Sequence, residues 1–184
     1  MLSRHREMIM PEITNFIPLI ALITYCGFLI TAMIGDIKSF TISNRLNILF
    51  FLSFIVFAIC MGLGYKQLLS HLWVAVISFI ICFILFTLGL FGGGDVKLVG
   101  ATCFWLGAGP IYTYALITAL TGGVLALTLL ISRKIVAKTG LPKGPKWVRA
   151  LLRKRVHIPY AIALGFGGFF AVLQTTWFPS FLHN

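Results

Sequence analysis

The chain has 184 residues, of which 59% are hydrophobic and only 10% are charged. Charged residues make up about a quarter of ordinary soluble domains, so this composition, with a mean hydropathy of +1.01, excludes a soluble globular domain and indicates an integral membrane protein. The net charge of +11 does not indicate nucleic-acid binding, because that function needs a solvated basic surface and most of this chain must face lipid.

Six uninterrupted apolar windows follow one another along the chain. A bilayer core of about 30 Å takes roughly 20 helical residues, so the windows predict an all-α polytopic bundle of about six transmembrane helices in a single membrane domain over residues 1–184. The fourth window is short and forms a full span only if its helix begins at or before Asp95. The windows are Phe16–Ile34, Leu46–Gly64, Leu72–Leu90, Leu98–Leu106, Ile111–Ile131 and Ile158–Phe178.

The first window follows Arg4 and Arg6, as the apolar stretch of a signal peptide would. It is too long for that role and no small-residue cleavage pattern follows it, so we expect it to remain as a membrane anchor.

Basic residues predict the orientation of the bundle, because loops rich in Lys and Arg stay in the cytoplasm. The loops after the first, third and fifth windows hold twelve Lys and Arg, and the opposite side holds three. We therefore expect these three loops in the cytoplasm and both termini outside. The first helix alone gives a tie, and the basic loop over residues 132–157 decides the orientation. Its nine charges over 133–155 are better explained by contact with anionic lipid than by an acidic protein partner.

The cysteines and histidines do not form a recognisable site. The four cysteines lie in separate apolar stretches without a C-x-x-C pair, which is typical of small buried side chains. The four histidines lie near the ends of the apolar segments and form no H-E-x-x-H motif. The sequence therefore predicts no metal site, no disulfide framework and no cofactor.

Asp36 and Asp95 are the only aspartates, and both fall at the predicted cytoplasmic boundary of the membrane. Ionisable groups at membrane depth are costly and usually mark function. The alternative is that each caps a helix end or pairs with Lys38 or Lys97. Because two such residues share one face of the bilayer in a chain with no other aspartate, we favour a functional pair.

Two carboxyl groups that share one water molecule can hydrolyse an amide. Like charges a few ångströms apart do not both ionise, so one carboxyl keeps its proton and polarises the carbonyl while the other acts as general base on the water. This chemistry needs neither a metal nor a Ser or Cys nucleophile.

The residues beside the aspartates leave alternatives open. Gly92, Gly93 and Gly94 could let an extended substrate approach the backbone, or they could form a flexible loop or helix cap. Lys97 could stabilise the ionised pair or extend to lipid headgroups, and we favour the second.

Two other segments are better explained by structure than by chemistry. Residues 41–44 form a cluster of turn formers and are typical of a connector. Pro159 stands at an allowed early position of the last predicted helix, and the glycines 165, 167 and 168 behind it are typical of close helix packing.

The two aspartate segments resemble the motifs of the type IV prepilin peptidases, membrane aspartyl proteases named for a G-x-G-D motif. Residues 92–98 read G-G-G-D-V-K-L and are similar to the family segment G-x-G-D-x-K-L. Asp36 is similar to the family's first aspartate, and residues 42–46 resemble its I-P-N-x-L continuation, with Asn44 at the asparagine and Ser43 in place of the usual proline.

A third segment carries the resemblance toward the end of the chain. Ile158-Pro159-Tyr160 resembles a family segment that reads P-Y-G or P-F-G, and Ala161 departs from it. The resemblance extends from Gly35 to Gly168 and implies that Asp36 and Asp95 are catalytic. It also implies that the three glycines, Asn44, Lys97, Pro159 and Tyr160 bind substrate or support the site.

The resemblance implies that the protein cleaves the short basic leader of a prepilin or pseudopilin just before a hydrophobic helix. Cleavage would take place at the cytoplasmic face of the inner (plasma) membrane. Longer family members carry a cysteine-bearing insertion and methylate the new amino terminus. The loop from Asp36 to Leu46 has no such insertion, so we expect no methyltransferase activity. The short form resembles the peptidases of tight-adherence pili, and archaeal preflagellin or prepilin peptidases are close alternatives.

Two functions of other classes remain as alternatives to a protease. One is a small proton-coupled carrier or channel in which the aspartates are protonation sites. The other is a non-catalytic subunit of a pilus assembly machine, which would tolerate the loss of both carboxyl groups.

Overall fold

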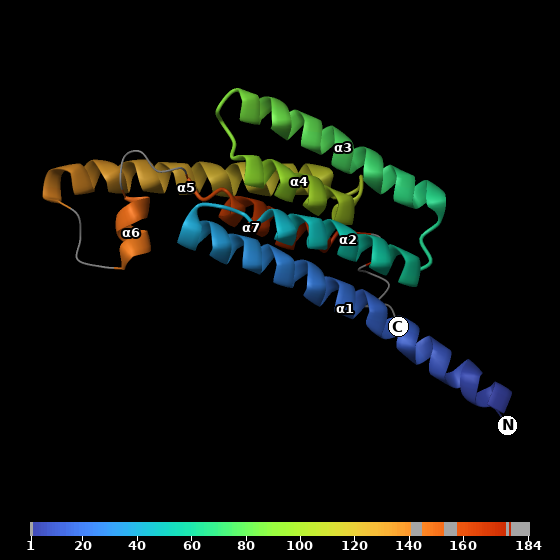
Figure 1. Cartoon of the computed structure of the whole chain (residues 1–184). Helices are drawn as coiled ribbons and strands as arrows, with labels where there is room; N and C mark the ends of the chain where they lie inside the picture. Colours follow the sequence, from blue (N-terminus) through green and yellow to red (C-terminus); the bar gives the residue numbers. More distant parts are fainter. Residues whose placement is uncertain (1, 141–144, 153–157, 176, 178–184) are drawn as a thin grey trace.

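The computed structural model describes residues 2–140, 145–152, 158–175 and 177. This part of the chain is helical and contains no strand, which confirms the predicted all-α membrane bundle. One helix overlaps each of the six apolar windows, and a seventh, short helix lies in the described part of the basic stretch. The helices are α1 Leu2–Ser39, α2 Asn44–Cys60, α3 Tyr65–Thr87, α4 Gly93–Leu106, α5 Ile111–Thr139, α6 Lys146–Leu151 and α7 Ala161–Val172 (Figure 1).

In the described part of the chain, three helices are long and apolar enough to cross a membrane. They are α1, α3 and α5, and most of their apolar side chains face outward, where a bilayer would cover them. The helices α2 and α7 are apolar but shorter, with 17 and 12 residues. By length, the described structure therefore combines three candidate spans with shorter helices that pack among them.

Helix α4 is the centre of the bundle, where it packs against α2, α3 and α7 (Figure 1). Eleven of its 14 residues are buried. The helix begins before Asp95, as a full span would require, but it covers only about 21 Å of the roughly 30 Å bilayer core. Trp105, which is fully buried, donates a hydrogen bond of 2.9 Å from Nε1 to the carbonyl oxygen of Phe50 on α2.

Glycines let α7 pack closely between α1 and α5, as the sequence predicted for Gly165, Gly167 and Gly168. A Cβ atom on Gly168 would lie 2.7 Å from Leu29 Cδ1 of α1, and one on Gly167 would collide with Thr118 of α5. Helices approach this closely only where small residues meet. The C-terminal helix is therefore fixed against both long neighbours.

The C-terminal helix is shorter than its apolar window predicted. It begins at Ala161 after the turn residue Tyr160, so Pro159 precedes the helix instead of standing in its first turn. The helix ends at Val172, and the expected end at Phe178 lies outside the described residues.

The basic stretch over 132–157 is partly helical. Helix α5 continues to Thr139, and the six residues of α6 follow in the described part of the stretch. The guanidinium of Arg133 donates from Nε and Nη2 to the carbonyl oxygen of Leu151, at 3.1 and 3.0 Å, and so links α5 to α6. Lys143 and the basic residues 153–155 lie outside the described residues, and the lipid contact of this stretch stays a prediction.

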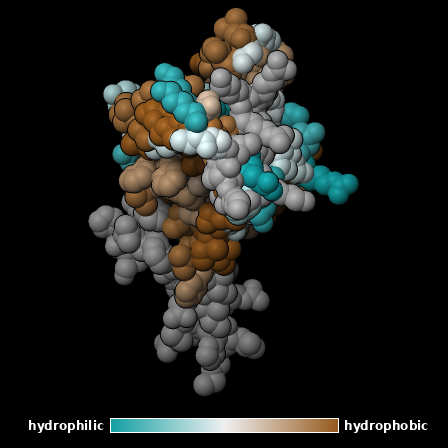
Figure 2. Space-filling model, turned by 90° about the vertical axis from the view of Figure 1, so that its left-hand side faces the viewer, coloured by the Kyte–Doolittle hydropathy of each residue, from teal (hydrophilic) through white to brown (hydrophobic). Residues whose placement is uncertain are grey.

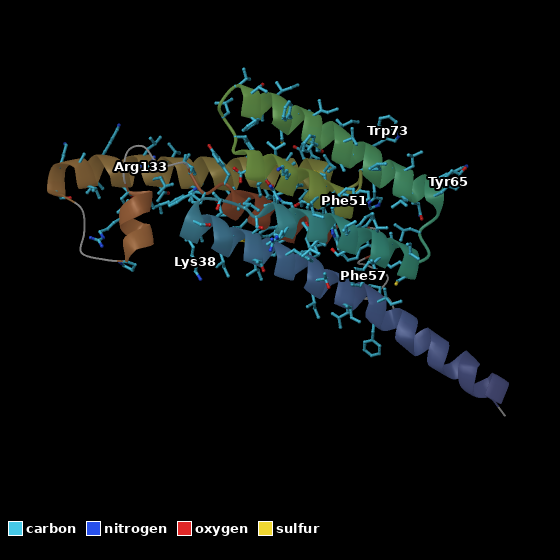
Figure 3. All side chains as sticks on the ribbon, viewed as in Figure 1. Lys38, Phe51, Phe57, Tyr65, Trp73 and Arg133 are labelled. Carbon is cyan, nitrogen blue, oxygen red and sulfur yellow. The ribbon has the colours of Figure 1, made fainter. Side chains whose placement is uncertain are left out.

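The C-terminal end of α1 and the N-terminal ends of α4 and α7 lie at the same end of the bundle (Figure 1). Lys38 and Arg133 lie toward this end, and Tyr65 lies at the other end (Figure 3). Figure 2 views the molecule from the end with Lys38 and shows hydrophilic residues beside apolar flanks. Asp36 and Asp95 therefore lie at the same end of the bundle, as the sequence indicated.

Candidate active site

Asp36 lies in the last turn of α1, and its side chain is only 6% exposed. Its Oδ2 atom accepts a hydrogen bond of 3.0 Å from the backbone N–H of Ala161. The first N–H groups of a helix have no partner within it, so the start of α7 offers a donor to a carboxylate. The contact joins residues that are 125 positions apart.

Asp95 is the third residue of α4, and its side chain is 8% exposed. Its Oδ2 atom accepts a hydrogen bond of 3.2 Å from the backbone N–H of Gly92, the N-cap residue. The carboxyl of Asp95 also interacts electrostatically with that of Asp36. The fold therefore brings together the two aspartates that the sequence singled out.

The turn between α1 and α2 packs one side of the site. Helix α1 ends at Ser39, and Phe40 adopts a left-handed conformation with φ of 53°. Ile42 then lies against Gly94, where a Cβ atom would stand 3.1 Å from the Cβ of Ile42. Residues 41–43 are a connector, as predicted, and Asn44 already begins α2. The connector also brings the end of α1 to the start of α4.

An aromatic pair covers another side of the site. The rings of Phe91 and Tyr160 stack with centroids 5.3 Å apart and an interplanar angle of 13°. Phe91 precedes Gly92, and Tyr160 precedes Ala161, the residue that donates to Asp36. Pro159 beside it is fully buried. This stacking aligns the start of α7 with the start of α4.

The helix-cap alternative holds for Asp95, and no described Lys or Arg forms an ion pair with either aspartate. Gly92 is the N-cap of α4, and Gly93 and Gly94 are its first two residues, so the glycines form a helix start and not a flexible loop. Lys97 is exposed and donates from Nζ to Asn44 Oδ1 at 2.7 Å. Its predicted contact with lipid headgroups stays open.

Each carboxyl has one oxygen held by a backbone N–H and one that is not. Within the described part of the chain, no hydrogen-bond donor reaches the second oxygen of Asp36 or Asp95. Backbone N–H groups fix the orientation of each carboxyl and leave an acceptor for water or substrate. The described residues contain no group of three His, Cys, Asp or Glu side chains around one point, and the absence of a metal stays a prediction.

Comparison with known families decides the class of the protein. The model of the type IV leader peptidase family matches residues 23–127, which is more than half of the chain. The chain belongs to the type IV leader peptidase family. Its activity is accordingly that of a peptidase, and its apolar helices agree with a membrane location. No curated protein and no solved structure gives a significant match.

The matched range contains both aspartates and all of α4, but it ends within α5. Helix α7 and the segment 158–160 lie beyond it. The N–H of Ala161 nevertheless binds the carboxyl of Asp36, so the candidate site includes a part of the chain that the family match does not cover.

Asn47 is a polar residue near the site that the sequence analysis missed. Its side chain is 5% exposed, and Nδ2 donates to the carbonyl oxygen of Gly94 at 3.4 Å. The signal was an amide inside an apolar window, between Leu46 and Ile48, where neighbouring positions are hydrophobic.

Proposed function

We propose that the protein is an aspartic endopeptidase that removes the leader peptide from prepilin-like or pseudopilin substrates, with Asp36 and Asp95 as its catalytic residues. One observation carries the proposal. The two carboxyls are buried at one end of the bundle and interact with each other, and each has one oxygen held by a backbone N–H. Family membership supports the peptidase class.

The proposed mechanism uses both carboxyls on one water molecule. Because two close carboxylates do not both ionise, one is protonated and the other is charged. The charged group takes a proton from water as the water oxygen attacks the scissile carbonyl, and the protonated group donates a hydrogen bond to the carbonyl oxygen. The C–N bond then breaks, and the leaving amine receives the proton that came from water.

The cellular setting is part of the same proposal. The distribution of basic residues supports an active site on the cytoplasmic side of the inner membrane. Lys38 stands at the end of α1 beside Asp36, in agreement with that orientation (Figure 3). The leader would approach from the cytoplasm, with the basic residues of the 133–155 stretch near anionic lipid.

Neutral variants of the aspartates test this proposal. Asp36→Asn and Asp95→Asn keep the side-chain size but remove the acid and base, so each should lower processing of a co-expressed prepilin by at least about 10²-fold. Cleavage is followed by gel mobility and by mass spectrometry of the new amino terminus, and membrane abundance is followed by immunoblotting.

Glu12→Gln is the matched control, because it removes one negative charge from the same helix in a position far from the site. It should process substrate at the wild-type rate. Efficient cleavage by either aspartate variant would overturn the proposal. Ion flux into liposomes that depends on the aspartates, without any cleavage, would instead indicate the carrier function. Pilus assembly that tolerates both variants would indicate an assembly subunit.

A further inference from the structure

The two helices that carry the aspartates are joined mainly through other helices. Asp36 lies in the last turn of α1 and Asp95 in the first turn of α4, and the backbones of these two helices rarely approach each other. Both helices pack along α2 and α7 instead. The rings of Tyr25 and Trp105 do join α1 to α4, but at the end of α4 that is far from Asp95. The relative position of the two carboxyls therefore depends on the neighbouring elements.

Each carboxyl accepts a hydrogen bond from the peptide group that follows an aromatic residue. The N–H group that binds Asp95 belongs to the peptide bond between Phe91 and Gly92. The N–H group that binds Asp36 belongs to the peptide bond between Tyr160 and Ala161. Because a peptide group is planar, each N–H is fixed relative to the Cα atom of the aromatic residue before it. Any displacement of either aromatic residue therefore displaces the donor of one carboxyl.

These two aromatic residues are the ones that stack on each other. Their rings are nearly parallel, with centroids 5.3 Å apart, although Phe91 lies before α4 and Tyr160 lies before α7. Both side chains are half-buried, and Phe91 packs against the hydrophobic core. Pro159, which is fully buried, restricts the backbone just before Tyr160. A continuous series of contacts therefore joins one carboxyl to the other through the two rings.

We propose that Phe91 and Tyr160 are positioning residues, and that the stacking of their rings sets the separation of the Asp36 and Asp95 carboxyls for the reaction. The inference rests on the proposed function and adds two residues that act through backbone N–H groups. The proposed mechanism needs both carboxyls on one water molecule, and a misplacement of about 1 Å can lower a catalytic rate about 10²-fold. Removal of the stack should therefore affect the chemical step and leave substrate binding unchanged.

Replacement of either ring by leucine tests the proposal. Phe91→Leu and Tyr160→Leu keep an apolar side chain but abolish stacking. Each should lower kcat by at least about tenfold and change KM by less than about twofold, for a synthetic peptide with a short basic leader and roughly 20 apolar residues. Tyr160→Phe keeps the ring and should recover most of the wild-type kcat. Phe166→Leu removes an exposed ring from α7 and is the matched control, with wild-type kinetics expected.

The double variant shows whether the two rings act on each other. Once one ring is absent, the other has no partner to hold, so Phe91→Leu/Tyr160→Leu should be within about twofold of the slower single variant. A loss equal to the product of the two single losses, about 100-fold or more, would show that the rings act independently and would overturn the inference. Thermal unfolding in detergent gives the folded fraction of each variant, and kcat is expressed per folded molecule.

Failure of the inference differs from failure of the proposed function. If wild-type protein does not cut the peptide, or if the Asp36→Asn and Asp95→Asn variants cut it efficiently, the proposed function is wrong. If wild-type protein cuts it and the leucine variants raise KM at an unchanged kcat, the rings bind substrate and do not position the carboxyls. A lower thermal stability with an unchanged kcat per folded molecule would reduce the stack to packing. Each of these last two results would overturn the inference, as would wild-type kinetics in both leucine variants.

Discussion

Helices α3 and α4 follow each other in the sequence and pack together, yet their surroundings are opposite. Helix α3 has 23 residues, and only His71 and Ala75 are buried. Helix α4 has 14 residues and is buried along almost its entire length. The longer helix is the strong membrane-span candidate, and the shorter one carries Asp95.

The difference shows that packing restricts the side chains of a buried helix, whereas a lipid-facing helix needs only side chains that are soluble in lipid. Lipid tails are as apolar as leucine, so an outward side chain of α3 loses little when it exchanges protein for lipid contact. Inside the bundle, α4 must fit the helices around it without cavities. The packed helix can therefore hold the carboxyl of Asp95 in a fixed orientation.

The sharpest contrast is expected for one leucine on each helix. Leu98 of α4 is fully buried and Leu69 of α3 is 48% exposed. Leu98→Ala should destabilise the protein by about 2–5 kcal/mol because it leaves a cavity, whereas Leu69→Ala should change stability by less than about 0.5 kcal/mol. Unfolding in mixed micelles measures both. Equal losses would mean that α3 and α4 do not differ in packing as described.

A smaller effect, on activity alone, is expected at the start of α4. A Cβ on Gly92 would stand 2.8 Å from Asp95 Oδ2, whereas one on Gly93 would meet only the ring of Phe86, at an ordinary 3.5 Å. Gly92→Ala should displace the carboxyl and lower kcat by about 10²-fold. Gly93→Ala should cost much less, and thermal stability in detergent should stay near wild type for both. A wild-type rate for Gly92→Ala would show that the Asp95 orientation does not limit cleavage.

The smallest expected effect compares two tryptophans. Trp105 of α4 donates to Phe50 and its ring meets that of Trp177, while Trp73 of α3 is 60% exposed. Trp105→Phe leaves a buried carbonyl without its donor and should destabilise the protein by about 1–3 kcal/mol. Trp73→Phe should leave the free energy of unfolding unchanged in the same experiment. A loss of stability comparable to that of Trp105→Phe would contradict the outward position of α3.

The apolar windows predicted every long helix because length and hydropathy are local properties. Boundaries were less accurate where tertiary contacts decide them. Pro159 lies outside α7 because the chain turns there to bring Ala161 to Asp36 and Tyr160 to Phe91. The short helix α6 was not predicted, since the basic charges of that stretch mark orientation rather than structure.

The two aspartates of the candidate site and several residues around them were singled out from the sequence, but the contacts among these residues were not. The scarcity of acidic residues singled out Asp36 and Asp95, and the glycines before Asp95 indicated a cap or loop. Asn47 was missed, because its contact with Gly94 joins two helices that are 47 positions apart. A single sequence without contacts gives no reason to separate this amide from a tolerated polar residue in an apolar window.

The sequence by itself determined that the chain is a helical membrane protein, and it singled out the two aspartates. Composition, the length of apolar stretches and charge can be read without knowledge of tertiary contacts. Only the tertiary structure decided that the two carboxyls lie near enough to interact electrostatically and that α7 supplies a donor to Asp36. It also decided that Asn47 donates to the carbonyl oxygen of Gly94, the residue before Asp95. These features depend on the close packing of helices distant in the chain, which small residues such as Gly94 and Gly168 make possible.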